Sequence, residues 1–499
     1  MRVLFIKSSR LEVAVNTYEP PMGLLSLAAY LRKKMGAEVR VANVVQMQDP
    51  AREVADVVRD MEPDLVGLSG LTCEAFMLHQ SAQIAKTIRP GVPVIAGGPY
   101  PSSDPERLLA DRNIDAAVIG EGEETLLDLA LRIQGEGRQF VNPGNLAAIR
   151  GVAYRGEDGV VRLSPPRPPI EDLDSLPQPA WDTIDLRWFW ARRSMSGGGV
   201  RPYLPVFTSR GCPYGCTYCH NLFGRGFRFR SAECVVEEIV ALRRTHGVND
   251  FEFLDDCVNL DPRRFEAILQ GLLDRGLHPK LHFPNGIRTD LLDEAQIRLL
   301  HQVGTGEVSV AVETTSSRLQ KLIHKHLNLE KVRSNIELMA DLRIFTRGFF
   351  MLGFPTETKE ELRATIDFAV SSRLHMAGFW ILNPYPGTPI YEQFKALGRL
   401  PNDVNSIDYD YGRAPFNGSE VPDKTFYGLH REAYRRFYFR PGRIMRILRD
   451  RPYSSGYGSL VRNFFSVQRL SHRQREEAGA PDIANGGLPA QRARITAER

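Results

Sequence analysis

Cysteine is scarce in this sequence, and long hydrophobic runs are missing. The 499 residues contain six cysteines, too few for the disulfide framework of a secreted protein. No apolar stretch approaches the ~20 residues that a membrane-spanning helix needs. The first residues carry no secretion-signal pattern, so we expect a cytoplasmic protein. The net charge of +4 is small for this length and gives no reason to expect nucleic acid as a partner.

Residues 1–135 alternate short apolar runs with helical patterns. We expect strands at 3–6, 39–44, 65–69, 94–98 and 116–120, and helices at 23–34, 50–61, 75–88 and 125–133. This alternation predicts an α/β domain with a doubly wound, Rossmann-like parallel sheet. Sheets of this kind bind ligands at the carboxyl ends of their strands.

The next stretch, residues 136–200, is expected to be a linker. Apolar segments flank the turn Gly156-Glu-Asp-Gly159 and predict a hairpin. A proline-rich run and the sequence Gly197-Gly-Gly199 follow, which indicate an irregular connection.

A second alternation occupies residues 201–400. Candidate strands are 203–208, 250–254, 281–285, 307–312, 346–352 and 376–382. About six βα units in ~200 residues fit a partial (β/α)6 barrel better than a complete barrel of eight. Beyond it we expect a C-terminal helical extension at 401–470 and a disordered tail at 471–499.

Three of the six cysteines lie within eight residues, in the segment Ser209-Arg-Gly-Cys212-Pro-Tyr-Gly-Cys216-Thr-Tyr-Cys219-His220. The segment follows a predicted strand, and its glycines and proline allow a tight curl that brings three thiolates to one cluster. Three thiolates on a four-iron cube leave one iron open to chelate a substrate. Two other interpretations stay open. One is the Cys-x2-Cys-His pattern of c-type haem attachment, which leaves Cys212 unused. The other is a zinc site of three cysteines and His220.

The spacing Cys-x3-Cys-x2-Cys after the first strand of a βα barrel, with Tyr218 before the last cysteine, resembles the radical S-adenosylmethionine (SAM) superfamily. The resemblance implies an oxygen-sensitive [4Fe–4S] cluster held by Cys212, Cys216 and Cys219. Its open iron would hold SAM. One electron from an external donor of flavodoxin or ferredoxin type would then cleave SAM to a 5′-deoxyadenosyl radical.

Segments at the ends of the later barrel strands are also similar to members of that superfamily. They imply further residues near SAM: Tyr218, Asp255, Asp256, Arg288 and Glu313. Family members place a carboxylate near the SAM ribose at the position of Glu313. Each residue also has a structural alternative. The two aspartates would cap a helix or line a rim, and Arg288 would be an ion-pair partner of Asp255 or Glu313.

A doubly wound domain before such a barrel is similar to the cobalamin-binding subclass. The resemblance implies a cobalamin site at Ser69, Gly70, Leu71, Thr72, Gly97, Gly98, Pro99, Tyr100, Gly120, Glu121 and Gly122. The Asp-x-His-x-x-Gly motif that ligates cobalt in many such domains is missing, and His79 is the only histidine before His220. We therefore expect base-off cobalamin without a histidine ligand. Cys73 is either a candidate for the lower face or a buried structural cysteine, and the whole domain is alternatively a scaffold without cofactor.

These resemblances imply a cobalamin-dependent radical SAM enzyme. We expect a C-methyltransferase that acts on an unactivated carbon of a small molecule or lipid, through the radical and methylcobalamin. Ring formation or rearrangement with the same cofactors is one alternative, and a non-catalytic iron–sulfur or cobalamin sensor is another.

The region 434–449 mixes arginine with large apolar side chains. Helical spacing gathers apolar residues on one side and arginines elsewhere: Ile444, Ile447, Leu448 and Arg443, Arg446, Arg449. The pattern predicts a helix that packs on the barrel and leaves its arginine face in solvent. The alternative is a peripheral contact with anionic lipid or a lipid-like substrate.

Overall fold

The computed structural model describes residues 1–9, 17–137, 141–196, 199–220, 222–400 and 417–453. The chain divides into two compact units, Met1–Tyr453 and Ser454–Arg499, and the first contains every described residue. The expectations for 454–470 and for the tail therefore lie outside the described residues. No described helix is long and apolar enough to cross a bilayer.

The N-terminal sheet has seven strands in the order β2-β1-β3-β4-β5-β6-β7. Their bounds are β1 Arg2–Lys7, β2 Glu38–Asn43, β3 Leu65–Ser69, β4 Val94–Gly97, β5 Ala116–Val118, β6 Val152–Arg155 and β7 Val161–Leu163. The first five strands are parallel, as predicted. β6 and β7 form an antiparallel hairpin that pairs with β5, so the sheet is mixed and this hairpin covers the β5 edge.

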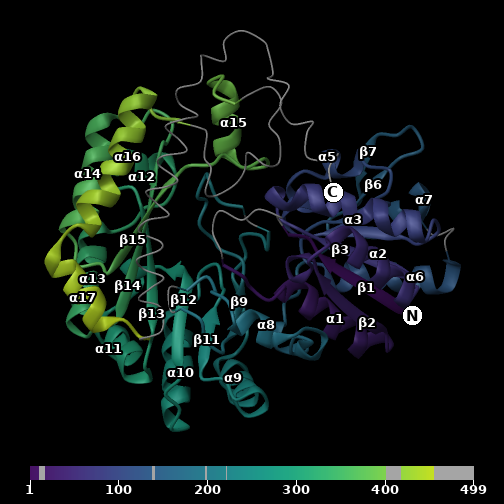
Figure 1. The fold of residues 1–499 in the computed structure, drawn as a ribbon, viewed down its shortest axis with the longest axis horizontal. Coiled ribbons are helices and arrows are strands. Elements are labelled where there is room, and N and C mark those ends of the chain that lie inside the picture. The colour runs from purple at the N-terminus through teal and green to yellow at the C-terminus, as the bar shows by residue number, and fades with distance from the viewer. Residues whose placement is uncertain (10–16, 138–140, 197–198, 221, 401–416, 454–499) are drawn as a thin grey trace. The chain divides into compact units, whose positions relative to one another are not determined.

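Helices cover both faces of this sheet (Figure 1). Their bounds are α1 Met22–Met35, α2 Pro50–Met61, α3 Ala75–Ile88, α4 Pro99–Ser103, α5 Pro105–Leu109, α6 Glu123–Glu136 and α7 Pro143–Ala147. Alternate residues of β1 enter two separate cores. Val3 and Phe5 pack with α1 and α6, whereas Leu4 and Ile6 pack with α2, α3 and α5. A strand buried on both faces needs the near-continuous apolar sequence that predicted it.

The second sheet has six parallel strands in the order β15-β14-β13-β12-β11-β8. Their bounds are β8 Leu204–Val206, β11 Asp250–Phe253, β12 Lys280–Ile287, β13 Glu307–Glu313, β14 Phe345–Leu352 and β15 Met376–Ile381. β8 and β15 are the two edges, which is the open arrangement expected of a partial (β/α)6 barrel. A short antiparallel pair, β9 Ser209–Arg210 and β10 Arg228–Phe229, follows β8.

Helices alternate with these strands (Figure 1). Their bounds are α8 Leu186–Trp190, α9 Ala232–His246, α10 Pro262–Asp274, α11 Glu294–Val303, α12 Ser317–Leu322, α13 Leu329–Asp341, α14 Lys359–Ser371 and α15 Pro389–Ala396. Side-chain caps start several of them. Ser231 accepts from the Cys234 N–H ahead of α9, and Thr358 and Glu361 form a capping box ahead of α14.

Two C-terminal helices follow, α16 Asp423–Tyr438 and α17 Pro441–Asp450. α16 packs against α14 and β15. The prediction that α17 would turn its arginine face to solvent is wrong for Arg443, which is buried, and for Ile444 and Leu448, which are exposed. The reason is that the Arg443 guanidinium donates to Val370 O and Ser372 O at the end of α14, so this helix is held by its polar side.

Candidate active site

The three clustered cysteines lie on a loop that leaves β8 and returns through β10. The Cys212 N–H donates to Gly224 O at 3.3 Å. Gly211 has φ +84°, and a Cβ there would stand 2.2 Å from Gly226 O. Only glycine fits this position, so the glycine ahead of Cys212 is a condition of the loop's shape.

The middle of the loop is anchored to two helices of the barrel. The Thr217 N–H donates to Ile323 O at 3.1 Å, just after α12. The Ile390 N–H of α15 donates to Thr217 O at 3.0 Å. Because both backbone groups of Thr217 are held, the positions of Cys216 and Cys219 on either side of it are fixed as well.

The three thiols share one environment. Cys219 is reachable by solvent, but the protein atoms around it raise the pKa of its thiol to about 12, and the charge of Cys216 adds to that rise. Among the described residues, no group of three His, Cys, Asp or Glu side chains lies close enough together to bind a single metal ion. A four-iron cube does not need this, since each thiolate binds its own iron. The donor set therefore fits a [4Fe–4S] cluster.

His220, the fourth ligand of the zinc alternative, has a different contact. Its Nε2 lies 2.9 Å from Pro386 O, and its ring packs against Tyr385. This nitrogen is directed to the loop after β15. A zinc-bound His220 would use its other ring nitrogen, Nδ1.

Asp255 anchors the strand that leads into the cysteine loop. Its Oδ1 accepts from the Thr208 N–H at 3.1 Å, from Thr208 Oγ1 at 2.8 Å and from Ser209 Oγ at 2.5 Å. The other oxygen, Oδ2, is buried without a hydrogen-bond partner in the described structure. Asp255 is therefore a buried polar anchor beneath the loop. It neither caps α10, whose cap is Asp261, nor lines an exposed rim.

Asp256 stands at the mouth of the site, reachable by solvent but surrounded by protein atoms. This burial and the neighbouring Asp255 charge raise the pKa of the Asp256 carboxyl to about 6, while a hydrogen bond from the Gly211 backbone opposes the rise. The carboxylate charge also acts on Cys212 and Cys219, so Asp256 lies beside the thiols.

Glu313 and Tyr218 meet at the end of β13. Glu313 is buried with φ +64°, at a register shift in the pairing of β13 with β14. The Tyr218 hydroxyl donates to its carboxylate, and Lys325 Nζ lies 3.6 Å from Glu313 Oε1. Burial raises the pKa of the Glu313 carboxyl, and Lys325 opposes that rise. A left-handed, buried glutamate is strained, and strain of this kind gathers at functional sites.

Lys325 is a site residue that the sequence reasoning missed. It lies between His324 and His326, whose φ angles are +55° and +52°. His324 O lies 3.8 Å from Cys216 Sγ, and the Lys325 charge acts on Cys212 and Cys219. The only signal in the sequence is the basic triplet His324-Lys-His326, which gives no hint of its contact with Glu313.

Arg288 has neither of the partners suggested for it. Its guanidinium forms a two-pronged ion pair with Asp290, with both N···O distances 2.9 Å. It also donates to Lys325 O at 3.2 Å and lies 4.0 Å from the centre of the Tyr214 ring. Arg288 thus braces the cysteine loop against the segment that carries Lys325.

The residues predicted for cobalamin follow β3, β4 and β5, at the carboxyl edge of the N-terminal sheet. The strand order places a topological switch point between β1 and β3. Gly98 has φ +99°, and a Cβ there would stand 2.9 Å from Ser69 Oγ. The loops after β3 and β4 therefore approach closely, and the Leu71 side chain between them is 38% exposed.

Two of the residues predicted for cobalamin, Thr72 and Tyr100, are buried. The Tyr100 side chain lies in the core, where its hydroxyl is 3.0 Å from His79 Nε2. His79 Nδ1 lies 2.8 Å from Asp111 Oδ2, so both ring nitrogens have partners. Cys73 is half-buried.

Ion pairs join the carboxyl edge of the N-terminal sheet to the cysteine loop. Glu121 accepts from Arg210 Nη1 at 3.0 Å and from Arg228 Nη2, and Arg210 Nη2 donates to Glu123 Oε1 at 2.5 Å. We call Glu121, Glu123, Arg210 and Arg228 the ion-pair clasp. All four side chains are largely buried. Arg210 precedes Cys212 by two residues, so the clasp holds the start of the cysteine loop.

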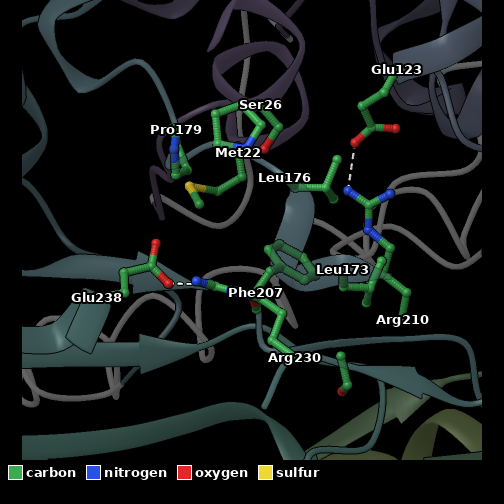
Figure 2. A pocket seen from close by; sticks show the side chains of 12 residues that line it. Met22, Ser26, Glu123, Leu173, Leu176, Pro179, Phe207, Arg210, Arg230 and Glu238 are labelled. Atoms are coloured by element: carbon green, nitrogen blue, oxygen red, sulfur yellow. Dashed lines mark hydrogen bonds and ion pairs between the residues drawn. The ribbon is translucent and has the colours of Figure 1, made fainter. Parts of the chain in front are cut away.

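A small cavity adjoins the clasp. Figure 2 shows Arg210 paired with Glu123, and Arg230 paired with Glu238, around its lining. Its volume of about 50 Å³ has room for a few water molecules but not for a cofactor. A larger, open hollow of about 670 Å³ lies beside the cysteine loop, lined by Pro213, Gly215 and His324 among others.

Comparison with known proteins agrees with this two-part site. The model of the B12 binding domain matches residues 12–130, and that of the radical SAM superfamily matches residues 206–369. The chain is 30% identical over 447 residues to the uncharacterized methyltransferase PH0819 of Pyrococcus horikoshii, covering 88% of this chain and 93% of the relative. It is 29% identical over 416 residues to the anaerobic magnesium-protoporphyrin IX monomethyl ester cyclase of Rubrivivax gelatinosus. That match covers 82% of this chain and 72% of the relative.

A solved structure shows the same fold. The radical SAM methyltransferase TsrM from Kitasatospora setae, with cobalamin and a [4Fe–4S] cluster bound, superimposes with a TM-score of 0.70 over 95% of this chain and 99% of that one, at 20% identity. The B12-binding match spans β2 to β5, and the radical SAM match spans the cysteine loop and β11 to β14. This chain therefore belongs to the cobalamin-dependent radical SAM enzymes.

Proposed function

We propose that the protein is a C-methyltransferase that acts on an unactivated carbon of a small molecule or lipid. The observation that carries the proposal is the ion-pair clasp, which ties the proposed cobalamin edge to the cysteine loop. A Cβ at Gly120 would lie 3.9 Å from Leu222 O, so this edge also comes close to the loop. When bound, the cluster with SAM supplies a carbon-centred radical and cobalamin supplies a methyl group. Methyl transfer needs the two close together.

The chain's own residues have positioning roles in this proposal. Glu313 would accept a hydrogen bond from the SAM ribose. Lys325 would pair with the SAM carboxylate, since its ammonium faces the thiols and is held by Glu313. A charge-assisted contact of this kind fixes both the position and the orientation of the substrate.

We expect Lys325→Met to raise the Kd for SAM about tenfold or more, because a hydrogen bond to a charged group is lost. Lys325→Arg should recover part of the affinity. The measurement is SAM titration of the cluster-loaded protein, followed by the change in the cluster's EPR spectrum. Lys321→Met, an exposed lysine in α12, is the matched control. Equal affinity of Lys325→Met and the control would rule out this role.

We also propose that cobalamin binds base-off without a histidine below the cobalt. Both nitrogens of His79 are engaged, by Asp111 and Tyr100, and no other histidine precedes His220. The EPR spectrum of the Co(II) form should then lack splitting from an axial nitrogen, in the native chain and in His79→Ala alike. A nitrogen splitting that disappears in His79→Ala would show that His79 ligates cobalt.

The function itself is tested without oxygen, on protein loaded with cluster and cobalamin and supplied with SAM and a strong reductant. We expect 5′-deoxyadenosine together with S-adenosylhomocysteine, the latter only when cobalamin is present. A methyl transfer consumes one SAM for the radical and one for the methyl group, so both products must form. If the loaded protein forms neither 5′-deoxyadenosine nor S-adenosylhomocysteine, the proposal is overturned.

A second candidate is a ring-forming reaction with the same cofactors. The similarity to the Rubrivivax gelatinosus cyclase favours it, since that match covers 82% of this chain. The same assay separates the two candidates. Formation of 5′-deoxyadenosine without S-adenosylhomocysteine would favour ring formation or rearrangement.

A further inference from the structure

The polarity of helix α17 is inverted. Its inward side carries two polar contacts on either side of the buried Ile447: Arg443 donates to Ser372 O at 2.7 Å, and buried Asp450 lies 3.1 Å from His375 Nε2. Its outward side is apolar, with Ile444 45% exposed, Met445 66% and Leu448 44%. The polar contacts at both ends of the helix fix its rotation, so the exposed apolar side is a set feature of the fold.

The exposed side of α17 is also strongly basic. The segment 440–451 contains five arginines, of which Arg443 is buried, and one acidic residue, buried Asp450, which accepts two hydrogen bonds from Arg449. Arg440 and Arg449 are exposed beside the apolar residues. The pKa of the Arg446 guanidinium is lowered first by its burial and next by the positive charges of Arg373 and Arg449. Cations are therefore crowded here and would gain from an anionic surface.

We propose that α17 lies on the surface of an anionic lipid bilayer, with Ile444, Met445 and Leu448 entering the boundary of the acyl chains. A helix that places apolar side chains outward with arginines around them has the features of an interfacial helix. Each arginine near an anionic surface adds to the attraction, and the long arginine side chains reach the headgroups while their stems stay apolar. An acidic protein surface would pair with the arginines, but it would not provide an apolar environment for the exposed side chain of Met445.

The test is co-sedimentation of the full-length, cofactor-loaded protein with lipid vesicles. We expect binding to phosphatidylcholine vesicles that contain phosphatidylglycerol, and little binding to phosphatidylcholine alone. Met445→Glu should lower the partition coefficient about tenfold or more, since an apolar side chain is lost from the lipid boundary and a repelled charge replaces it. Arg449→Gln should lower it about fivefold, and high salt should weaken binding in the same direction.

Val160→Glu is the matched control, because Val160 is an exposed apolar residue of the hairpin next to β7, 56% exposed. It should bind vesicles like the native chain. 5′-Deoxyadenosine formation by Met445→Glu, equal to that of the native chain, checks that the fold is intact and separates this inference from the proposed function. Absence of binding to anionic vesicles, or equal binding by Met445→Glu, overturns the proposal. A dimer that Met445→Glu dissociates, without vesicle binding, overturns it in favour of a second copy of the chain.

Discussion

Cys216→Ala should lose most of its iron and sulfide after reconstitution, and 5′-deoxyadenosine formation should fall to background. The reason is that the cube has only three protein ligands, and Cys216 is the middle one, fixed next to the anchored Thr217. Losing a direct ligand should cost more than the roughly 10- to 100-fold that changes around metal ligands cause. Metal analysis and product quantification under anaerobic conditions measure both effects.

Cys234→Ala is the matched control for this prediction. Cys234 is half-buried on α9, where Arg230 Nη2 lies 3.2 Å from its sulfur. Its replacement should leave iron content and activity near those of the native chain. Cys216→Ala with full iron content would contradict the assignment of the loop. Zinc in place of iron, lost in His220→Ala, would favour the zinc interpretation.

Most strands were predictable because their sequence carries the signal locally. β3 occupies the predicted range 65–69, and α2 the predicted range 50–61. A strand buried on both faces must be apolar throughout, and a helix with Asp49 as cap and Pro50 in its first turn marks its own start. The cysteine loop was predictable for the same reason, since its three cysteines lie within eight residues of one another.

The partners of charged residues were not predictable in this way. Lys325 meets Glu313 across a turn and a helix, and Arg288 chooses Asp290 over the two carboxylates suggested for it. Such pairings depend on which strand ends the fold brings together, and a charged residue carries no sign of its partner in the sequence. Tyr100 illustrates the same limit, because its glycine-rich context pointed to a ligand while its side chain fills the core.

The orientation of α17 shows a different limit. Helical periodicity grouped Ile444, Ile447 and Leu448 apart from the arginines, but in the structure Ile447 is buried on the side of Arg443, and Arg449 is exposed with Ile444 and Leu448. The assignment of the apolar side to the core follows the usual rule for surface helices. Here the carbonyl groups at the end of α14 accept from Arg443, and that contact between elements decides the orientation.

Glu121→Ala should be strongly destabilising. Glu121 stood among the residues predicted to bind cobalamin, yet both of its oxygens are bound by arginines, one by Arg210 and one by Arg228. Its removal leaves two largely buried guanidinium groups near each other without their shared carboxylate. Breaking a buried ion pair from one side costs about 3–5 kcal/mol. Chemical denaturation of the cofactor-free protein measures the loss.

Glu124→Ala, in the first turn of the adjoining helix α6, is the matched control. Its side chain is 46% exposed and lies 3.3 Å from Arg167, so its loss should cost about 0–1 kcal/mol. Equal destabilisation by the two variants would mean that the clasp contributes no more than a surface pair. A double-mutant cycle of Glu121→Ala with Arg228→Met should give a coupling energy of about 1–3 kcal/mol, because the two side chains are in contact.

The clasp also predicts an effect on chemistry that destabilisation alone would not produce. Glu121→Gln keeps an acceptor for one arginine but loses the charge that holds both, so the proposed cobalamin edge and the cysteine loop should be less firmly joined. In this variant 5′-deoxyadenosine formation should persist, because the cluster ligands and Glu313 are untouched. S-adenosylhomocysteine formation should fall relative to 5′-deoxyadenosine formation, since methyl transfer depends on the alignment of the proposed cobalamin edge with the cysteine loop. If both products fall together, or neither changes, the clasp has no part in that alignment.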